Sequence, residues 1–136
     1  MAEAAHSGQH AAPAGSRAWA AAAFLAGWLV PGLGHVLLKR WSRAAVFFVS
    51  IVGLAAVGLW LHGKVYDSHA ADPFEWLGYL ADLGSGVLYP VAQHLSIAPD
   101  LARAAGDYGT RFFAAAGALN LLCAFDAYAI GTGEKE

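Results

Sequence analysis

The sequence predicts an all-α, polytopic membrane protein with a helical hairpin, a further transmembrane helix, and an amphipathic helix that lies in the interface or spans. Three observations support this fold class. Of the 136 residues, 58% are hydrophobic and only 13% are charged, about half the charged fraction of a soluble domain. Long stretches carry no charge at all. One of them, residues 44–60, is apolar on every face and offers no polar stripe to water.

Two uncharged stretches are long enough to cross the hydrocarbon layer, which takes about 20 residues. We expect spans over 18–38 and 44–62, neither of which contains Asp, Glu, Lys or Arg. A third span is expected over 112–130, where Asp126 is the one charged residue. The alternative, a helix buried in a soluble core, would need more surrounding chain than this protein has.

The rest of the chain divides simply. Residues 1–16 have no periodic pattern and are expected to form a disordered tail. Residues 17–136 are expected to form a single helical membrane domain. A cleaved signal peptide is disfavoured, because the first apolar stretch is too long and lacks a small-x-small cleavage site.

The first span is expected to break or kink, because a proline removes a backbone donor and glycines permit positive φ. The hairpin turn contains Pro31, Gly32, Gly34 and His35. A short basic tip without acids follows and should face the cytoplasm. The expected location is the cell membrane, crossed several times by the chain. This cytoplasmic tip carries Lys39, Arg40 and Arg43. Over the whole chain, three spans divide the basic residues four against four, and four spans divide them five against three.

An amphipathic helix is expected near 73–95. The Asp-Pro-x-Glu sequence at 72–75 has the N-cap, first-position proline and third-position acid of a helix start. The Gly-Ser-Gly sequence at 84–86 should break or bend this helix. It either lies in the interface or spans with its polar stripe inward. The break and the acids Glu75 and Asp82 favour the interface.

The last span carries small residues around one amide. The helical neighbours of Asn120 and of the next turn are Ala116, Gly117, Cys123, Ala124 and Ala127. Such a face lets another backbone approach while the amide bonds across. Packing within the chain is the favoured interpretation. Contact with a partner subunit, a ligand or an ion is the alternative.

Asp126 is the second polar residue of this span. A carboxylate at membrane depth is costly unless it is paired, hydrated or placed at the headgroups. Four side chains could pair with it: Arg17, Arg40, Arg43 or His35. Structural pairing or interfacial exposure is favoured over proton or ion handling.

No metal site, no cofactor and no catalysis are expected. The histidines lie in the tail or near helix ends without i, i+4 pairs, so a haem-like group held by histidine is the weakest hypothesis. Cys123 lies in an apolar stretch that leaves a thiol inert. The sequence contains no Gly-x-Ser-x-Gly, P-loop or HExxH motif. A net charge of −2 excludes a basic nucleic-acid-binding surface.

Two motifs carry a resemblance to known proteins. The sequence Gly-Trp-Leu-Val-Pro-Gly-Leu-Gly-His at 27–35, with Lys-Arg-Trp at 39–41, resembles the small membrane hairpins of the transmembrane-two domain type. The closing Leu-Asn-x-x-x-x-x-Asp-Ala-Tyr sequence at 119–128 resembles a bacterial family of unknown function that begins with the same turn. The resemblance implies a membrane location and no established activity.

The leading hypothesis is therefore a non-catalytic integral membrane protein, an accessory or small subunit that sits in the lipid bilayer. It would associate with other membrane proteins, or with itself, through the Asn120 face. The alternative is a transport or ion-conducting element that uses Asp126, Asn120 and the polar stripe containing Glu75 and Asp82.

Overall fold

The protein is described by a computed structural model that covers residues 14–135. These residues form six α-helices and no strand, which confirms the all-α class. Residues 1–13 of the predicted tail lie outside the described residues, and residues 14–16 already belong to the first helix. In chain order the helices are α1 (Ala14–Leu29), α2 (Leu33–Leu37), α3 (Trp41–Trp60), α4 (Pro73–Leu83), α5 (Leu88–Leu95) and α6 (Ala104–Gly131).

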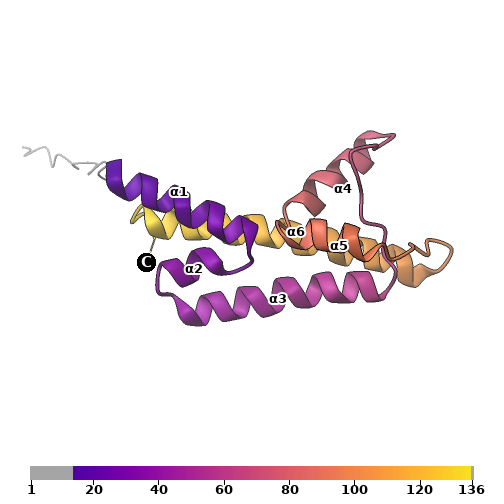
Figure 1. Cartoon of the computed structure of the whole chain (residues 1–136), viewed down its shortest axis with the longest axis horizontal. Helices are drawn as coiled ribbons and strands as arrows, with labels where there is room; N and C mark the ends of the chain where they lie inside the picture. Colours follow the sequence, from indigo (N-terminus) through magenta and orange to yellow (C-terminus); the bar gives the residue numbers. More distant parts are fainter. Residues whose placement is uncertain (1–13, 136) are drawn as a thin grey trace, which may run out of the picture.

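Two long antiparallel helices, α3 and α6, run the length of the molecule (Figure 1). Both are long and apolar enough to cross a membrane, and they contain most of the predicted spans 44–62 and 112–130. They approach closely near the end of α3, where a methyl group on Gly58 would lie 2.8 Å from the carbonyl oxygen of Gly109. Large apolar side chains such as Val49 and Leu122 lie exposed on their outer faces.

The predicted span 18–38 is not one helix. α1 ends at Leu29, and the chain reverses through Pro31 and Gly32 into α2, which runs back beside α1 (Figure 1). Gly32 has a φ of 80°, a left-handed conformation that glycine adopts without strain. The expected break at Pro31 is confirmed, but it reverses the chain completely. The start of α1 and the turn between α2 and α3 therefore lie at the same end of the molecule.

The segment 73–95 is also a hairpin and not a single helix. It starts as expected: Asp72 Oδ1 accepts a hydrogen bond from the backbone N–H of Glu75 at 2.8 Å, with Pro73 in the first turn. After α4 the chain turns through residues 84–87, and α5 runs back toward the end where α4 began (Figure 1). The expected break or bend at 84–86 is a break that reverses the chain, so no continuous spanning helix forms over 73–95.

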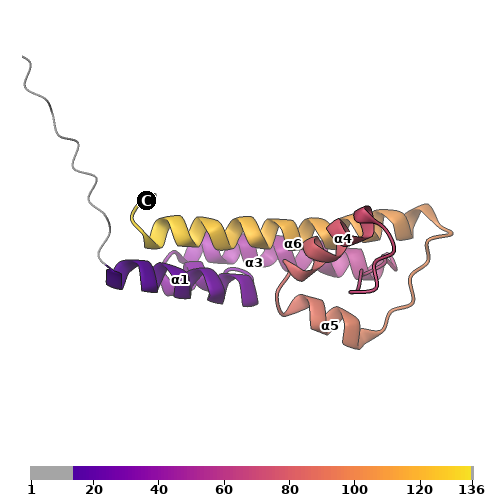
Figure 2. The same cartoon turned by 90° about the horizontal axis from the view of Figure 1, so that it is seen from above.

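The two hairpins, α1–α2 and α4–α5, start at opposite ends of the molecule, and their turns meet part-way along α6. In both views α1 lies along the C-terminal half of α6, and α4 lies nearer its N-terminal half (Figures 1 and 2). The backbone N–H of Val87 donates to the carbonyl of Leu29 at 2.8 Å, which joins the two turns directly. Each hairpin thus covers about half of one long helix.

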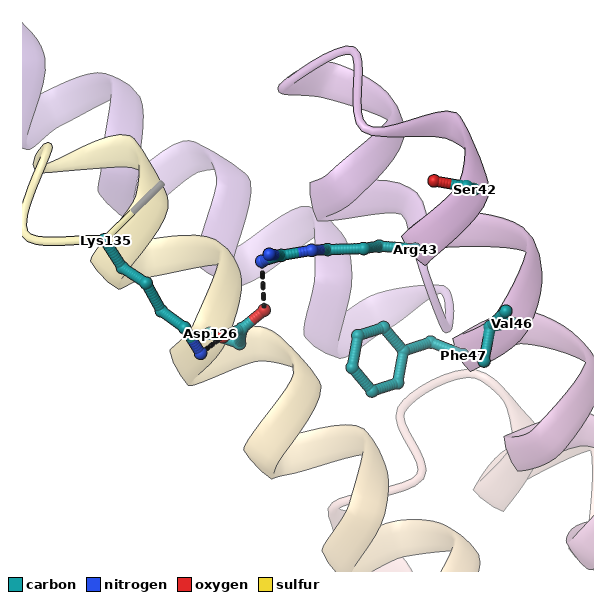
Figure 3. A pocket seen from close by; sticks show the side chains of 6 residues that line it. All are labelled: Ser42, Arg43, Val46, Phe47, Asp126 and Lys135. Atoms are coloured by element: carbon teal, nitrogen blue, oxygen red, sulfur yellow. Dashed lines mark hydrogen bonds and ion pairs between the residues drawn. The ribbon is translucent and has the colours of Figure 1, made fainter.

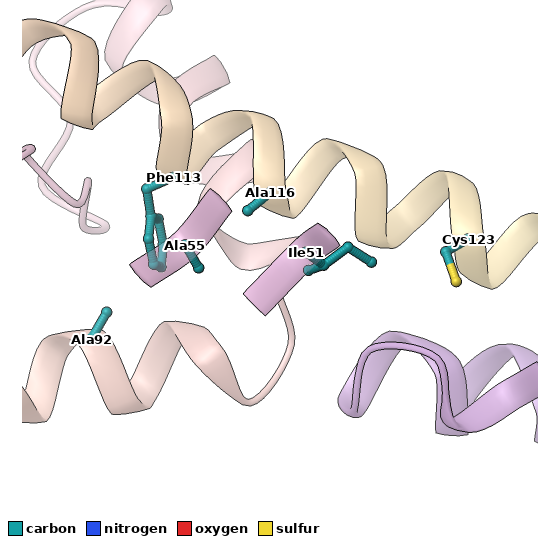
Figure 4. Close-up of a cluster of buried hydrophobic side chains, with 6 residues drawn as sticks. All are labelled: Ile51, Ala55, Ala92, Phe113, Ala116 and Cys123. Atoms are coloured by element: carbon teal, nitrogen blue, oxygen red, sulfur yellow. The ribbon is translucent and has the colours of Figure 1, made fainter. Parts of the chain in front are cut away.

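The buried apolar core is small and lies between α3, α5 and α6 (Figure 4). Half of its members are alanines, which let the helix backbones pack closely. It consists of Ile51, Ala55, Ala92, Phe113, Ala116 and Cys123. The remaining buried positions of the bundle include polar groups, and these form the candidate site.

Candidate functional site

One face of α6 carries three polar or reactive side chains at steps of three residues: Asn120, Cys123 and Asp126. Side chains at this spacing project from neighbouring positions of a helix surface. All three face the α1–α2 hairpin, which contributes His35 from α2. His35, Asn120 and Cys123 are at most 1% exposed. The turn motif and the closing motif, which lie at opposite ends of the chain, therefore form one site.

His35 contacts both Cys123 and Asp126. Its Nε2 lies 2.9 Å from Asp126 Oδ2, and its Nδ1 lies 3.5 Å from Cys123 Sγ. The ring of Phe47 packs against the imidazole with centroids 5.0 Å apart. Because Cys123 and Asp126 approach different ring nitrogens, one metal ion could not bind all three residues. Among residues 14–135 no group of three such side chains could hold a metal ion.

The order Cys–His–Asp is that of a nucleophile, a base and an orienting acid. Here, however, the thiol of Cys123 is 1% exposed. The neighbouring pocket is lined by Asp126 and Phe47, without Cys123. A substrate would have to displace packed side chains to reach the sulfur. The contacts of His35 with Cys123 and Asp126 therefore hold α2 against α6.

Asp126 is paired more fully than the sequence indicates. Of the four predicted partners, His35 bonds to it and the Arg43 guanidinium lies 3.7 Å away. A third partner, Lys135, donates to Oδ1 of the same carboxylate (Figure 3). The sequence does not point to Lys135, because this residue comes after the predicted helix. It reaches Asp126 because the chain turns back after α6, where the N–H of Glu134 donates to the Ala129 carbonyl at 3.1 Å.

A pocket of about 360 Å³ lies beside this carboxylate, between α3 and the end of α6 (Figure 3). Polar side chains form one part of it and apolar side chains the other. It is lined by Ser42, Arg43, Val46, Phe47, Asp126 and Lys135. The other two members of the predicted basic tip, Lys39 and Arg40, form the turn between α2 and α3.

Asn120 joins the two hairpins. Its Nδ2 donates to the carbonyl of Trp28 at 2.8 Å and to the carbonyl of Gly84 at 2.9 Å. These carbonyls belong to the C-terminal ends of α1 and α4, where a helix leaves its last acceptors without intrahelical donors. The indole Nε1 of Trp28 donates to the carbonyl of Leu83 at 3.2 Å and supplies a third bond at the same junction.

The small residues around Asn120 pack within the chain. Their face is covered by α1, α2 and α4, and a methyl group on Gly117 would lie 1.8 Å from the carbonyl oxygen of Ala81. The fully or almost fully buried members are Ala116, Gly117, Cys123, Ala124 and Ala127. A partner subunit would have to bind a different surface.

Two buried oxygens near this junction stand out. Asp82 is 0% exposed; its Oδ2 accepts from the backbone N–H of Tyr66 at 2.8 Å. Neither Asp82 Oδ1 nor Asn120 Oδ1 accepts a hydrogen bond from any residue within 14–135. The interfacial placement that the sequence favours would leave Asp82 on an exposed polar stripe, whereas the structure buries it.

At the end of the bundle opposite the α2–α3 turn, Lys64 Nζ and Glu75 Oε1 form an ion pair at 2.5 Å. The backbone N–H of Ala71 and the Lys64 ammonium lower the pKa of Glu75 below its usual value. The hydrogen bond to Glu75 raises the pKa of Lys64 in turn. This pair ties the start of α4 to the segment that follows α3.

Comparison with protein families gives one match. A family described as a family of unknown function (DUF6677) matches residues 22–136. The chain belongs to this family. The matched region of the DUF6677 chain contains both the turn at 31–35 and the closing motif at 119–128, so the expected relation to a family of unknown function is confirmed. Neither curated proteins nor solved structures give a match.

Proposed function

We propose that the protein is an integral membrane protein in which α3 and α6 cross the bilayer and the two hairpins enter it from opposite sides. The observation that carries this proposal is the distribution of charge. No charged residue lies between Arg43 and Lys64 along α3 or between Arg111 and Asp126 along α6. Between these limits the outer faces expose apolar side chains such as Val49 and Leu122, at 68% and 66%. Such a surface suits lipid and not water.

The hydrogen bonds at the hairpin junction support the same placement. In lipid, every backbone polar group needs a partner within the protein. A helix that ends inside the bilayer leaves carbonyls that water cannot reach. Asn120 and Trp28 donate to three of these carbonyls, and Val87 donates to a fourth. The junction therefore supplies the donors that a site at membrane depth requires.

We assign the end with the basic turn to the cytoplasm. Basic residues gather on the cytoplasmic side of membrane proteins. At that end the described charged residues are Arg17, Lys39, Arg40, Arg43 and Lys135, with Asp126 and Glu134. At the other end they are Lys64, Arg103 and Arg111, with Asp67, Asp72, Glu75, Asp100 and Asp107. Five cations against two acids at one end, and three against five at the other, support this orientation.

Within the membrane we propose a non-catalytic role, as an accessory component that associates with other membrane proteins. The Asn120 face is occupied by the chain's own helices, so association would use α4. This helix diverges from α6 and exposes Phe74, Leu77 and Leu80 at three-residue steps (Figure 1). These side chains are 82%, 64% and 56% exposed, so they form a contiguous apolar surface along α4.

The test has two stages. Membranes from expressing cells are washed with alkaline carbonate, and the protein should stay in the pellet; release into the supernatant would contradict the membrane proposal. Next, the protein is purified in mild detergent with Leu77→Ser and Leu80→Ser together, and with Val49→Ser as a control on lipid-facing α3. Co-purifying membrane proteins should be lost only with the α4 variant. Equal recovery with both variants would contradict association through α4.

A second candidate function, a transport or ion-conducting element, is favoured by the two buried acceptor oxygens on Asn120 and Asp82. The Asp82 oxygen could receive a proton, and either oxygen could contact a cation. The check is ion flux into liposomes that contain the purified protein. Flux should fall in Asp126→Asn and Asp82→Asn, and flux that neither substitution changes would exclude this candidate.

A further inference from the structure

We propose that the pocket between α3 and the end of α6 binds the phosphate headgroup of an anionic phospholipid. This inference rests on the proposed membrane location and extends it to a specific ligand. The pocket holds about 360 Å³ and is open beside Asp126 (Figure 3). Three properties carry the proposal: the cations and hydroxyl at the pocket, the apolar wall below them, and the charge of the surrounding end of the molecule.

The polar part of the pocket has the chemistry of a phosphate site. Arg43 and Lys135 both line it, with side chains 40% and 56% exposed, and Ser42 adds a hydroxyl. Guanidinium and ammonium groups are the preferred partners of phosphate oxygens. The negative charge of Asp126 would repel a bound anion, but its Oδ2 is already bonded to His35 Nε2 at 2.9 Å. Two cations thus share one carboxylate, and both remain accessible from the pocket.

The apolar part of the pocket indicates a lipid and not a soluble phosphate. Val46 and Phe47 lie one helical turn further along α3 than Ser42 and Arg43, which is about 6 Å deeper. Val46 is 64% exposed, so an acyl chain could lie against it. Polar groups above and apolar groups below match a headgroup with its attached chains. Trp41, which is 67% exposed at the same end, is of the type that gathers at the membrane interface.

The positive charge around the pocket favours a headgroup with a net negative charge. Lys39 and Arg40 lie in the adjoining turn, so cations outnumber acids around the pocket. Basic groups close to the cytoplasmic surface are attracted to anionic lipids, each by enough to change binding several-fold. The opposite end carries more acids than bases and provides an internal control through Arg103 and Arg111.

The experiment titrates the full-length protein, in an uncharged detergent, with three probes. These are phosphatidylglycerol, phosphatidylcholine and inorganic phosphate, and bound lipid is counted by native mass spectrometry. We expect phosphatidylglycerol to bind at least about tenfold more tightly than phosphatidylcholine, and inorganic phosphate not to compete. Equal binding of both lipids would overturn the proposal. Competition by inorganic phosphate at comparable concentration would assign the pocket to a soluble anion and also overturn it.

Variants locate the binding. Arg43→Gln with Lys135→Gln should weaken phosphatidylglycerol binding about 10- to 30-fold, whereas Arg103→Gln with Arg111→Gln should leave it unchanged. If the first pair alters the thermal unfolding midpoint, Ser42→Asp replaces it, because this exposed position adds a negative charge without removing a partner of Asp126. Unchanged binding in the pocket variants would overturn the proposal. The carbonate wash tests the membrane location separately, so the two failures are distinguishable.

Discussion

Asn120 contacts both hairpins through the hydrogen bonds of its side chain. One amide nitrogen donates to carbonyls of two helices that come from opposite ends of the molecule. A hydroxyl has one donor hydrogen and could serve only one of these carbonyls, whereas an amide has two. The ring of small residues around it is necessary because the backbones must approach within reach of a short side chain.

Replacing Asn120 by leucine should lower the free energy of unfolding by about 1–3 kcal/mol. The branching and the number of heavy atoms of the side chain are preserved, but two carbonyls at the junction lose their donor. Leu122→Ala on the exposed side of the same helix should change stability by less than about 0.5 kcal/mol. The measurement is unfolding in detergent followed by circular dichroism. Equal effects of both substitutions would show that the amide contributes nothing specific.

The Lys64–Glu75 ion pair predicts that the stability of the protein decreases at low pH. Because the folded-state pKa of Glu75 is lowered, its contribution to stability is present at neutral pH and is lost as pH falls through that pKa. The contribution of Lys64, whose pKa is raised, persists at neutral pH and is lost only as pH rises through its folded-state value. Wild type should therefore have a higher thermal midpoint than Glu75→Gln at pH 7, and the gap should close as pH falls through the lowered folded-state pKa of Glu75. A gap that is independent of pH would contradict the ion pair.

At the scale of elements, the molecule contains two helical hairpins whose helices are too short to cross a bilayer. α1 has 16 residues and α4 has 11, against the roughly 20 that a span needs. Each hairpin packs against α6 at a position without a large side chain. For α4 that position is Gly117, where the backbones touch.

Gly117→Ala should displace α4 or destabilise the protein by at least about 2 kcal/mol, because the new methyl group would overlap the carbonyl oxygen of Ala81. Gly53→Ala in α3 is a matched control. No atom lies within 4 Å of a methyl group there, so helix propensity alone should stabilise it by up to about 1 kcal/mol. Hydrogen exchange of α4 and α5 measures the displacement. Normal protection of this hairpin in Gly117→Ala would refute the close packing.

At the scale of the whole molecule, the described chain has two ends of opposite charge, and the start of α1, the α2–α3 turn and the end of α6 share the basic one. A single span over 18–38 would place the start of α1 and the α2–α3 turn at opposite ends of the molecule. The reversal at Pro31 keeps them together. In the proposed membrane placement, the path of the chain therefore depends on one turn.

Cysteine labelling distinguishes the two paths. In sealed vesicles, an impermeant maleimide should reach Ser16→Cys and Ser42→Cys from the same side and Ser68→Cys from the other. The native Cys123 is 1% exposed and serves as an unreactive background. Labelling of Ser16→Cys together with Ser68→Cys would favour a complete first span and contradict the hairpin.

The residue pattern by itself determined the all-helical class, the long helices α3 and α6, the start of α4 at Asp72 and the break at Pro31. These features are local, because they depend on apolar length, capping chemistry and backbone restrictions. The pattern also indicated that the small residues around Asn120 pack within the chain. Each of these features is encoded by residues that lie close together in the sequence.

Only the tertiary structure decided that both breaks are reversals, because a proline or a glycine permits a kink and a hairpin equally. It likewise decided that His35, Cys123 and Asp126 form one chain of contacts, that Lys135 joins them, and that Asp82 is buried. These contacts join residues up to 91 positions apart. Their formation depends on how the helices stack against α6, and that arrangement is set by packing across the whole molecule.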